Sequence, residues 1–251
     1  MTIPPTKLNL IGGGVDISLP NVSYCEDVKD VHYLPYNLVR FYVGEITRAT
    51  PQTVNIYTDS STSVDVEVSE GNKWYSYVLP KDKGLYKIEG DSVKKVVVKA
   101  NISTENTNII PSSTIEASFK GCKILHNMNN MFSLCTALTS LDISSVDTSK
   151  VTSMDYMFDG CNNITSLDLS SFNTSNVTSM KSMFEICSGM TSLDLSNFDT
   201  SKVTSMYDMF LDCNSLTTIR MVGCSEATVN KIKAQLTTDG ISLDKVNIIT
   251  E

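Results

Sequence analysis

Basic residues are few in this chain of 251 residues. Lysine and arginine together number 20, against 28 aspartates and glutamates, which gives a formal net charge of −8. A protein that binds nucleic acid by neutralising phosphates needs a basic stripe on its surface. The acidic balance therefore excludes DNA and RNA as expected partners.

Histidine is scarce as well. The two histidines, His32 and His126, lie apart from any pair of cysteines, and no Cys-x-x-Cys sequence occurs. A zinc site needs several nitrogen or sulfur ligands at short, regular spacing. We therefore expect no metal site and no cofactor. Because no motif places a histidine near a serine or cysteine nucleophile, we also expect no enzyme.

The sequence lacks an apolar run long enough to cross a membrane, so we expect no membrane insertion. Its first residues, Met-Thr-Ile-Pro-Pro-Thr-Lys, do not form the basic segment and long apolar segment of a signal peptide. Without such a signal we expect the chain to fold in a cytoplasm. Unpaired cysteines are typical of that compartment.

Small hydroxyl residues and methionine are abundant instead. The chain holds 32 serines, 26 threonines and 11 methionines. Ten of the methionines and six of the seven cysteines lie between Cys122 and Cys224, whereas residues 1–110 hold the single tryptophan and most of the tyrosines. Such a bias is typical of low complexity or of repetition.

A sequence repeat with a period of 26 residues accounts for the bias. Cys135 and Cys161, for example, are 26 residues apart, and so are Cys187 and Cys213. One repeat cannot bury its own apolar face, so the repeats are expected to stack into a solenoid. Four columns of apolar residues recur at this spacing: Cys135, Cys161, Cys187 and Cys213; Met131, Met157, Met183 and Met209; Phe132, Phe158, Phe184 and Phe210; and Leu141, Leu167, Leu193 and Ile219.

Each repeat is expected to contain a short strand and a short helix. Leu167 and Leu169 flank Asp168, and this alternation predicts a strand with leucine inward and aspartate outward. The apolar residues from Val177 to Cys187 recur at the spacing of one helix face. That spacing predicts one or two helical turns.

The two ends of the array are degenerate, as the end caps of solenoids are. A shift by one period places Glu116 under Asp142, in a weakened first repeat. At the other end Val229 and Ile232 keep the helical phase, and residues 246–249 are expected to close the sheet.

The motif of one repeat, read from Leu193 to Cys213, is L-D-L-S followed by F-D-T-S-x-V-T-x-M and M-F-x-x-C. It resembles the BspA-like leucine-rich repeat of bacterial surface proteins, over about residues 115–250. The resemblance implies a right-handed α/β solenoid of the leucine-rich-repeat type, used for adhesion or protein binding without catalysis.

The sequence pattern of the amino-terminal half predicts an all-β unit. Short β-branched or aromatic runs alternate there with turn residues, as in a small sandwich or barrel. The expected fold is thus β-rich with two domains: residues 1–100 form a docking domain, 101–114 a linker, and 115–251 the solenoid. The predicted strands are Leu8–Ile11, Leu38–Val43, Thr53–Tyr57, Ser63–Val68, Lys73–Val78, Leu85–Ile88 and Val93–Lys99.

The outward strand positions of the repeats are the candidate binding face. Paired strands lie about 4.8 Å apart, so an acidic row forms there that Arg220 would end by pairing with Asp194. This face would bind a basic or polyhydroxylated partner, or a cation such as calcium. The competing and favoured interpretation is a solvated ladder of turn-capping aspartates, since single carboxylates do not cluster as calcium ligands do. The candidate residues are Asp142, Asp168, Asp194, Ser140, Ser166, Ser192 and Arg220, with Glu116 expected to begin the acidic row.

The four cysteines of the repeat would stack closely enough for disulfides to form. Each occupies the last apolar position of the predicted helical face of its repeat, where cysteine behaves as a small apolar residue. We therefore expect buried free thiols.

Three functions are compatible with these patterns. We expect a non-enzymatic component of a bacteriophage virion, such as a head, neck or tail decoration or fibre, assembled in the host cytoplasm as part of an oligomer. Residues 1–110 would contact neighbouring virion subunits, and the solenoid would contact a protein or glycan on a bacterial surface. The first alternative is a secreted or cell-surface bacterial adhesin of the BspA-like type without its signal. The second is a carboxylate-dependent hydrolase, because a glycosidase needs only two carboxyl groups.

Overall fold

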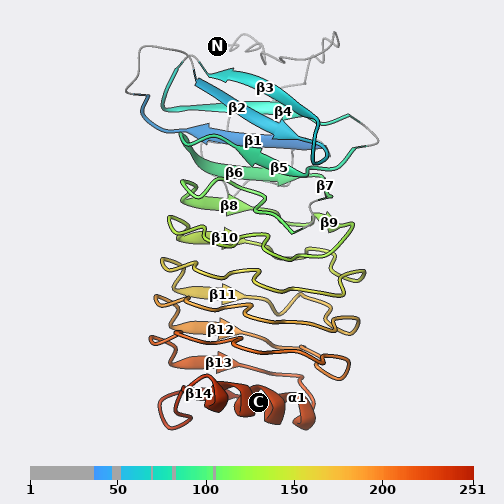
Figure 1. Ribbon diagram of the computed structural model, residues 1–251, viewed down its shortest axis with the longest axis vertical. Helices are drawn as coiled ribbons and strands as arrows, with labels where there is room; N and C mark the ends of the chain where they lie inside the picture. Colours follow the sequence, from blue (N-terminus) through green and yellow to red (C-terminus); the bar gives the residue numbers. More distant parts are fainter. Residues whose placement is uncertain (1–36, 47–51, 69, 81–82, 104–105) are drawn as a thin grey trace, which may run out of the picture.

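The computed structural model describes residues 37–46, 52–68, 70–80, 83–103 and 106–251. They form a β-rich solenoid, a stack of coils with one described helix at its carboxy-terminal end (Figure 1). The elements are β1 (Leu38–Val43), β2 (Gln52–Tyr57), β3 (Ser63–Val68), β4 (Lys73–Val78), β5 (Lys87–Glu89), β6 (Val93–Lys99), β7 (Asn101–Ile102), β8 (Glu116–Ser118), β9 (Lys123–Ile124), β10 (Ser140–Asp142), β11 (Ser166–Asp168), β12 (Ser192–Asp194), β13 (Thr218–Arg220), α1 (Glu226–Thr238) and β14 (Asn247–Ile249).

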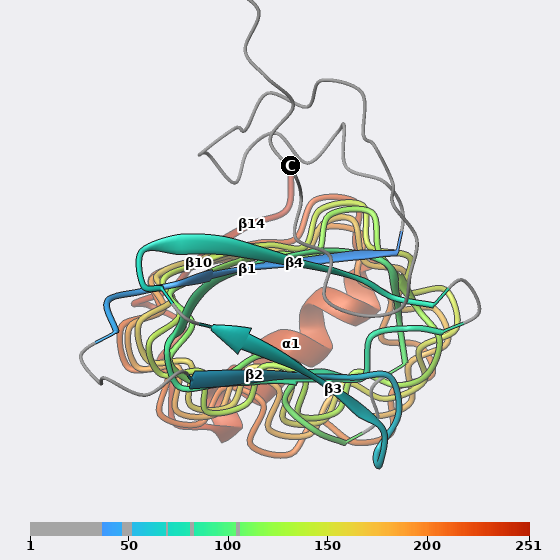
Figure 2. The same cartoon turned by 90° about the horizontal axis from the view of Figure 1, so that it is seen from above.

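The amino-terminal strands continue the solenoid. β1, β4 and β6 lie in one five-stranded sheet with β8 and β10, and β2, β3 and β5 form a second sheet on the opposite side of the stack (Figure 2). A single apolar core runs from Val39 to Val246. The separate small sandwich or barrel expected from the sequence is not supported, because β1, β4 and β6 share a sheet with β8 and β10 and the core is continuous with that of the solenoid.

The individual strands of this half agree better with the sequence. β1, β3, β4 and β6 have the bounds that the β-branched and aromatic runs predicted, β2 begins one residue earlier, and β5 is shifted toward Glu89. The predicted strand Leu8–Ile11 lies outside the described residues. The expected linker contains β7, whose Ile102 is buried against the common core. Its role as a boundary between two domains stays a prediction.

The apolar columns of the repeat form the core of the solenoid, as predicted. The rings of Phe158 and Phe184 stack with centroids 5.6 Å apart and planes 2° from parallel. Phe132 and Phe210 extend this stack at 5.6 and 5.8 Å. Identical side chains one coil apart thus fill the interior with a continuous aromatic column.

The apolar segment of each repeat that was expected to be helical, such as the one from Val177 to Cys187, forms turns instead. The N–H groups of Tyr156 and Phe158 donate to carbonyl oxygens of the next coil, at 2.8 and 2.9 Å. Between them, the N–H of Met157 bonds only three residues back, to Met154, at 3.3 Å. An α-helix would satisfy these groups four residues back within one coil. Bonds between coils have therefore replaced the predicted helix.

Positive φ angles occur twice in each of these turns. In one coil they fall at Tyr156 and Gly160, with φ of 57° and 69°. Right-handed helices do not accommodate such residues. The expected α/β architecture is therefore corrected to a β-solenoid whose only helix, within the described part of the chain, is α1. The corresponding pairs in the other coils are Asn130 and Leu134, Ser182 and Ile186, and Asp208 and Asp212.

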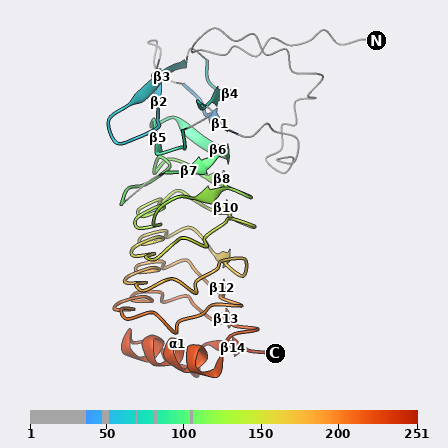
Figure 3. The same cartoon turned by 90° about the vertical axis from the view of Figure 1, so that its right-hand side faces the viewer.

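The carboxy-terminal end is capped as expected. α1 lies across the end of the stack (Figure 3) and buries Val229, Ile232 and Leu236. Ser225 caps the helix by accepting a hydrogen bond from the Thr228 N–H at 3.2 Å. β14 pairs with β13 in parallel and ends the sheet.

Candidate binding face and seam

The outward face of β11, β12 and β13 carries the predicted rows. Asp168 lies opposite Asp194, which lies opposite Arg220, and a row of Ser166, Ser192 and Thr218 runs beside them. The Nε of Arg220 lies 3.5 Å from Oδ2 of Asp194. The expected ion pair that ends the acidic row is therefore present.

The first member of the row is placed differently from the prediction. β10 pairs with β8 so that Asp142 lies opposite Ser118, and Ser140 lies opposite Glu116. Glu116 instead forms an ion pair with Lys95 at 3.0 Å. The error came from applying the full period to the first coil, because the paired positions 116 and 140 differ by 24 and not by 26.

The strand ladder is interrupted between β10 and β11. In the regular coils the backbone N–H of Leu169 donates to Asp194 O at 2.9 Å. The equivalent bond, from Ile143 N to Asp168 O, is not formed within residues 106–251, and β10 and β11 belong to different sheets. We call this interruption the seam.

The seam lies where two sheets meet. β10 ends the sheet that contains β8, β6, β1 and β4, whereas β11 begins the sheet that contains β12, β13 and β14. The strands on the two sides of the seam, β10 and β11, are both three residues long.

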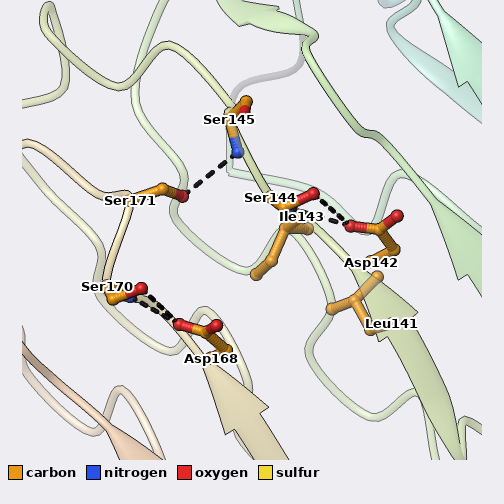
Figure 4. Close-up of a pocket in the computed structure, with 8 residues that line it drawn as sticks. All are labelled: Leu141, Asp142, Ile143, Ser144, Ser145, Asp168, Ser170 and Ser171. Atoms are coloured by element: carbon orange, nitrogen blue, oxygen red, sulfur yellow. Dashed lines mark hydrogen bonds between the residues drawn. The ribbon is translucent and has the colours of Figure 1, made fainter. Parts of the chain in front are cut away.

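A hollow of about 250 Å³ occupies the seam (Figure 4). Asp142 and Asp168 each cap the turn that follows them: Oδ1 of Asp142 accepts from Ser144 N at 3.0 Å, and Oδ1 of Asp168 accepts from Ser170 N at 2.9 Å. The lining residues are Leu141, Asp142, Ile143, Ser144, Ser145, Asp168, Ser170 and Ser171.

One side-chain contact bridges the seam. The backbone N–H of Ser145 donates to the hydroxyl oxygen of Ser171, at 3.2 Å (Figure 4). In the same region, Oδ2 of Asp142 and Oδ2 of Asp168 accept no hydrogen bond from any described residue. Each aspartate therefore caps a turn with one oxygen, as the favoured interpretation expected, while its other oxygen has no partner among the described residues.

This geometry limits the chemistry of the face. A calcium ion takes six to eight oxygen ligands. Among the described residues, no group of three or more histidine, cysteine, aspartate or glutamate side chains could hold a metal ion. Carboxylate oxygens and hydroxyl groups arranged in rows can instead form hydrogen bonds or ion pairs with an external partner.

The cysteine column holds free thiols, as expected. Cys135, Cys161, Cys187 and Cys213 are buried and unpaired. Burial raises the pKa of the Cys135 thiol to about 12 and that of Cys213 also to about 12. These groups stay protonated and pack as small apolar side chains.

Part of the solenoid matches the model of a known family. Residues 125–233 match a family described as "Mycoplasma protein of unknown function, DUF285". This segment contains most of the repeats. Searches of curated proteins and of solved structures found no match. In the described part of the chain, no helix is long and apolar enough to span a membrane.

Sequence reasoning found the rows of the face but missed the seam. Two sequence features lie near it: the strand spacing is 24 from β8 to β10 before it becomes 26 from β10 to β11, and Val146 stands where the next coil has Phe172. Neither feature shows by itself that a hydrogen-bonded ladder will open.

Proposed function

We propose that this protein is a non-enzymatic interaction protein that binds a partner through the outward face of β10 to β13. The observation that carries the proposal is the seam, where a hollow coincides with two carboxylate oxygens that have no partner among the described residues. The coils on either side are joined by regular backbone hydrogen bonds. The face is therefore preorganised, which lowers the entropic cost of binding.

The polar groups of the face suit a polyhydroxylated ligand such as a bacterial surface glycan. Carboxylate oxygens accept hydrogen bonds from sugar hydroxyls, and the neighbouring serines can donate or accept. Each single contact is weak. Binding would gain strength from several copies of the protein in an oligomer, which raise the effective concentration of the face.

We propose a display role for the whole chain, with two settings. In a bacteriophage virion, residues 1–110 would contact neighbouring subunits while the solenoid projects outward. In a bacterial adhesin, the same solenoid would face the environment of the cell, and the match to a family described from Mycoplasma, a bacterial genus, favours this second setting. The genes beside this one distinguish the two, since structural phage genes support the virion and their absence supports the adhesin.

Paired substitutions test the face. The variant Asp142→Asn with Asp168→Asn removes both charges but keeps the turn caps, because Asn173 caps its own turn through the same oxygen position, accepting from Ser175 N at 3.1 Å. The matched control is Asp147→Asn with Asp199→Asn, which removes two charges from a second row of capping aspartates.

The readout is binding of the labelled protein to an array of bacterial surface glycans. We expect the seam variant to lose at least tenfold in binding while the control variant retains it. Equal binding by both variants, or no glycan bound by the unsubstituted protein, would overturn the proposal. Turnover of a bound glycan that disappears with one Asp or Glu substitution would favour the hydrolase instead.

A further inference from the structure

Three large apolar side chains are exposed on one side of the solenoid. Leu134, Ile186 and Tyr207 are 57%, 43% and 64% exposed, and only two other large apolar residues in the described part of the chain are exposed to a comparable degree. All three lie in the turns that replace the predicted helix. We call these turns, residues 129–135, 155–161, 181–187 and 207–213, the turn face.

Two of these side chains occupy backbone positions that disfavour them. Leu134 and Ile186 have φ angles of 55° and 56°, in the left-handed region. Gly160 and Asp212 hold the same position in the neighbouring coils, at 69° and 60°, and glycine and aspartate tolerate this conformation better. Neither the core nor the backbone therefore requires leucine or isoleucine here. Strain combined with exposure points to a contact outside the chain.

The stack places Leu134, Gly160, Ile186 and Asp212 in one continuous column. The N–H of Leu134 bonds to the coil of Gly160, through Asp159 O at 2.7 Å, and the N–H of Gly160 bonds to the coil of Ile186, through Glu185 O at 2.8 Å. The Leu134 side chain lies across Gly160, since a Cβ added to that glycine would stand 2.8 Å from Leu134 Cδ2. The small residue lets the leucine cover the coil between the two apolar positions.

The turn face is strongly acidic. Its four segments contain the carboxylates of Asp155, Asp159, Glu185, Asp208 and Asp212 against the single cation of Lys181. That cation is already engaged, with its Nζ 5.2 Å from the centre of the Tyr156 ring. Burial and the charge of Glu185 raise the pKa of Asp159, so neighbours within the chain do not fully relieve the repulsion between these like charges.

We propose that the turn face docks a basic polypeptide segment of a partner protein, whose apolar side chains cover Leu134, Ile186 and Tyr207 while its lysines or arginines pair with the surrounding carboxylates. Charge complementarity selects this occupant. A second copy of the chain would bring two acidic surfaces together, which costs free energy. A neutral glycan would bring no cations to pair with these carboxylates, so a basic polypeptide suits this side better.

A peptide of ten residues with alternating lysine and leucine is the probe, and a peptide of alternating glutamate and leucine is its control. Binding to the full chain is measured by fluorescence anisotropy at low and at high salt. We expect the lysine peptide to bind, with affinity that falls as salt screens the charges, and the glutamate peptide not to bind.

The decisive variant is Leu134→Asn with Ile186→Asn. Asparagine accepts positive φ, so thermal unfolding should show this variant to be at least as stable as the unsubstituted chain. Its affinity for the lysine peptide should fall at least tenfold, and Tyr207→Ser should weaken binding in the same direction. The seam variant, Asp142→Asn with Asp168→Asn, should bind the peptide unchanged.

Three results would overturn the inference. They are failure of the unsubstituted chain to bind the lysine peptide, equal binding by the Leu134 and Ile186 variant, and loss of peptide binding in the seam variant alone. The last result would move the peptide to the sheet face. Because glycan binding by the seam is measured separately, failure of either proposal leaves the other standing.

Discussion

The thiol of Cys187 donates a hydrogen bond to the backbone carbonyl of Phe158 in the preceding coil, with 3.0 Å between Sγ and O. Cys161 and Cys213 repeat the contact with Phe132 and Phe184, at 3.1 and 2.9 Å. Each of these carbonyls also accepts a bond from the backbone N–H three residues on, so the thiol supplies a second hydrogen bond inside the apolar core. Cys135, at the same position of the first coil, makes no such bond to a described residue and offers a natural comparison.

Truncating Cys187 should cost more than truncating Cys135. Both are 0% exposed, so Cys135→Ala and Cys187→Ala leave similar cavities and should each destabilise the fold, by about 1–3 kcal/mol. Only Cys187→Ala also removes a hydrogen bond to a carbonyl, Phe158 O, which keeps its bond from the Cys161 N–H, so the added cost should be at most about 1 kcal/mol. Urea unfolding measures the difference. Equal losses would show that the thiol contact contributes nothing to stability.

The order in which cysteines react with iodoacetamide should follow burial. Burial raises the pKa of the Cys122 thiol to about 11 and of the Cys213 thiol to about 12, so almost no thiolate forms at pH 8. Cys224 is only half-buried. Among these three, mass spectrometry should find Cys224 modified first and the others only when the chain unfolds. Rapid labelling of Cys213 in the native protein would contradict the structure.

Removing the charge of Asp159 should stabilise the protein at neutral pH. Burial and the nearby Glu185 raise the pKa of Asp159 in the folded state. The folded chain therefore binds this proton more tightly than the unfolded chain, and the resulting stability is present below the ordinary pKa and lost as pH rises through the raised value. Asp159→Asn should raise the free energy of unfolding at pH 7, by less than about 1 kcal/mol because the group is partly solvated.

Asp147→Asn is the matched control for that experiment. Hydrogen bonds from Ser149 lower the pKa of Asp147, so its contribution has the opposite sign, present above the ordinary pKa and lost as pH falls through the folded value. Urea unfolding between pH 3 and pH 8 should therefore show a gain at neutral pH for the Asp159 variant alone. A gain of the same size in both variants would point to net charge as the cause.

The phenylalanine column should be the most sensitive part of the core. Phe158 is fully buried and stacks on Phe132 and Phe184, each at 5.6 Å. Phe158→Ala removes a ring from the middle of the column and should cost about 3–5 kcal/mol. Tyr207→Ala, an exposed position, should change stability by less than about 0.5 kcal/mol. Chemical denaturation compares the two, and similar losses would contradict the core described here.

The pattern of the sequence predicted the columns better than the path of the chain between them. Identical residues at a constant spacing had to stack, and Phe132 to Phe210 do so. The turn at Tyr156 was mistaken for a helix because its inward residues recur at spacings that a helix face also has. Hydrogen bonds from Tyr156 and Phe158 to the next coil decided otherwise, and such bonds leave no mark on apolar periodicity.

The candidate site shows the same division. The row from Asp168 to Arg220 followed from the repeat alone, because equal spacing fixes the register of neighbouring coils. The seam at Asp142 depends on where one sheet of the stack ends and the next begins, and the turn face depends on which side chains the stack leaves exposed at positive φ. Local sequence determined the repeating unit and its buried columns. Packing between distant segments decided where the ladder opens and which surfaces remain available for a partner.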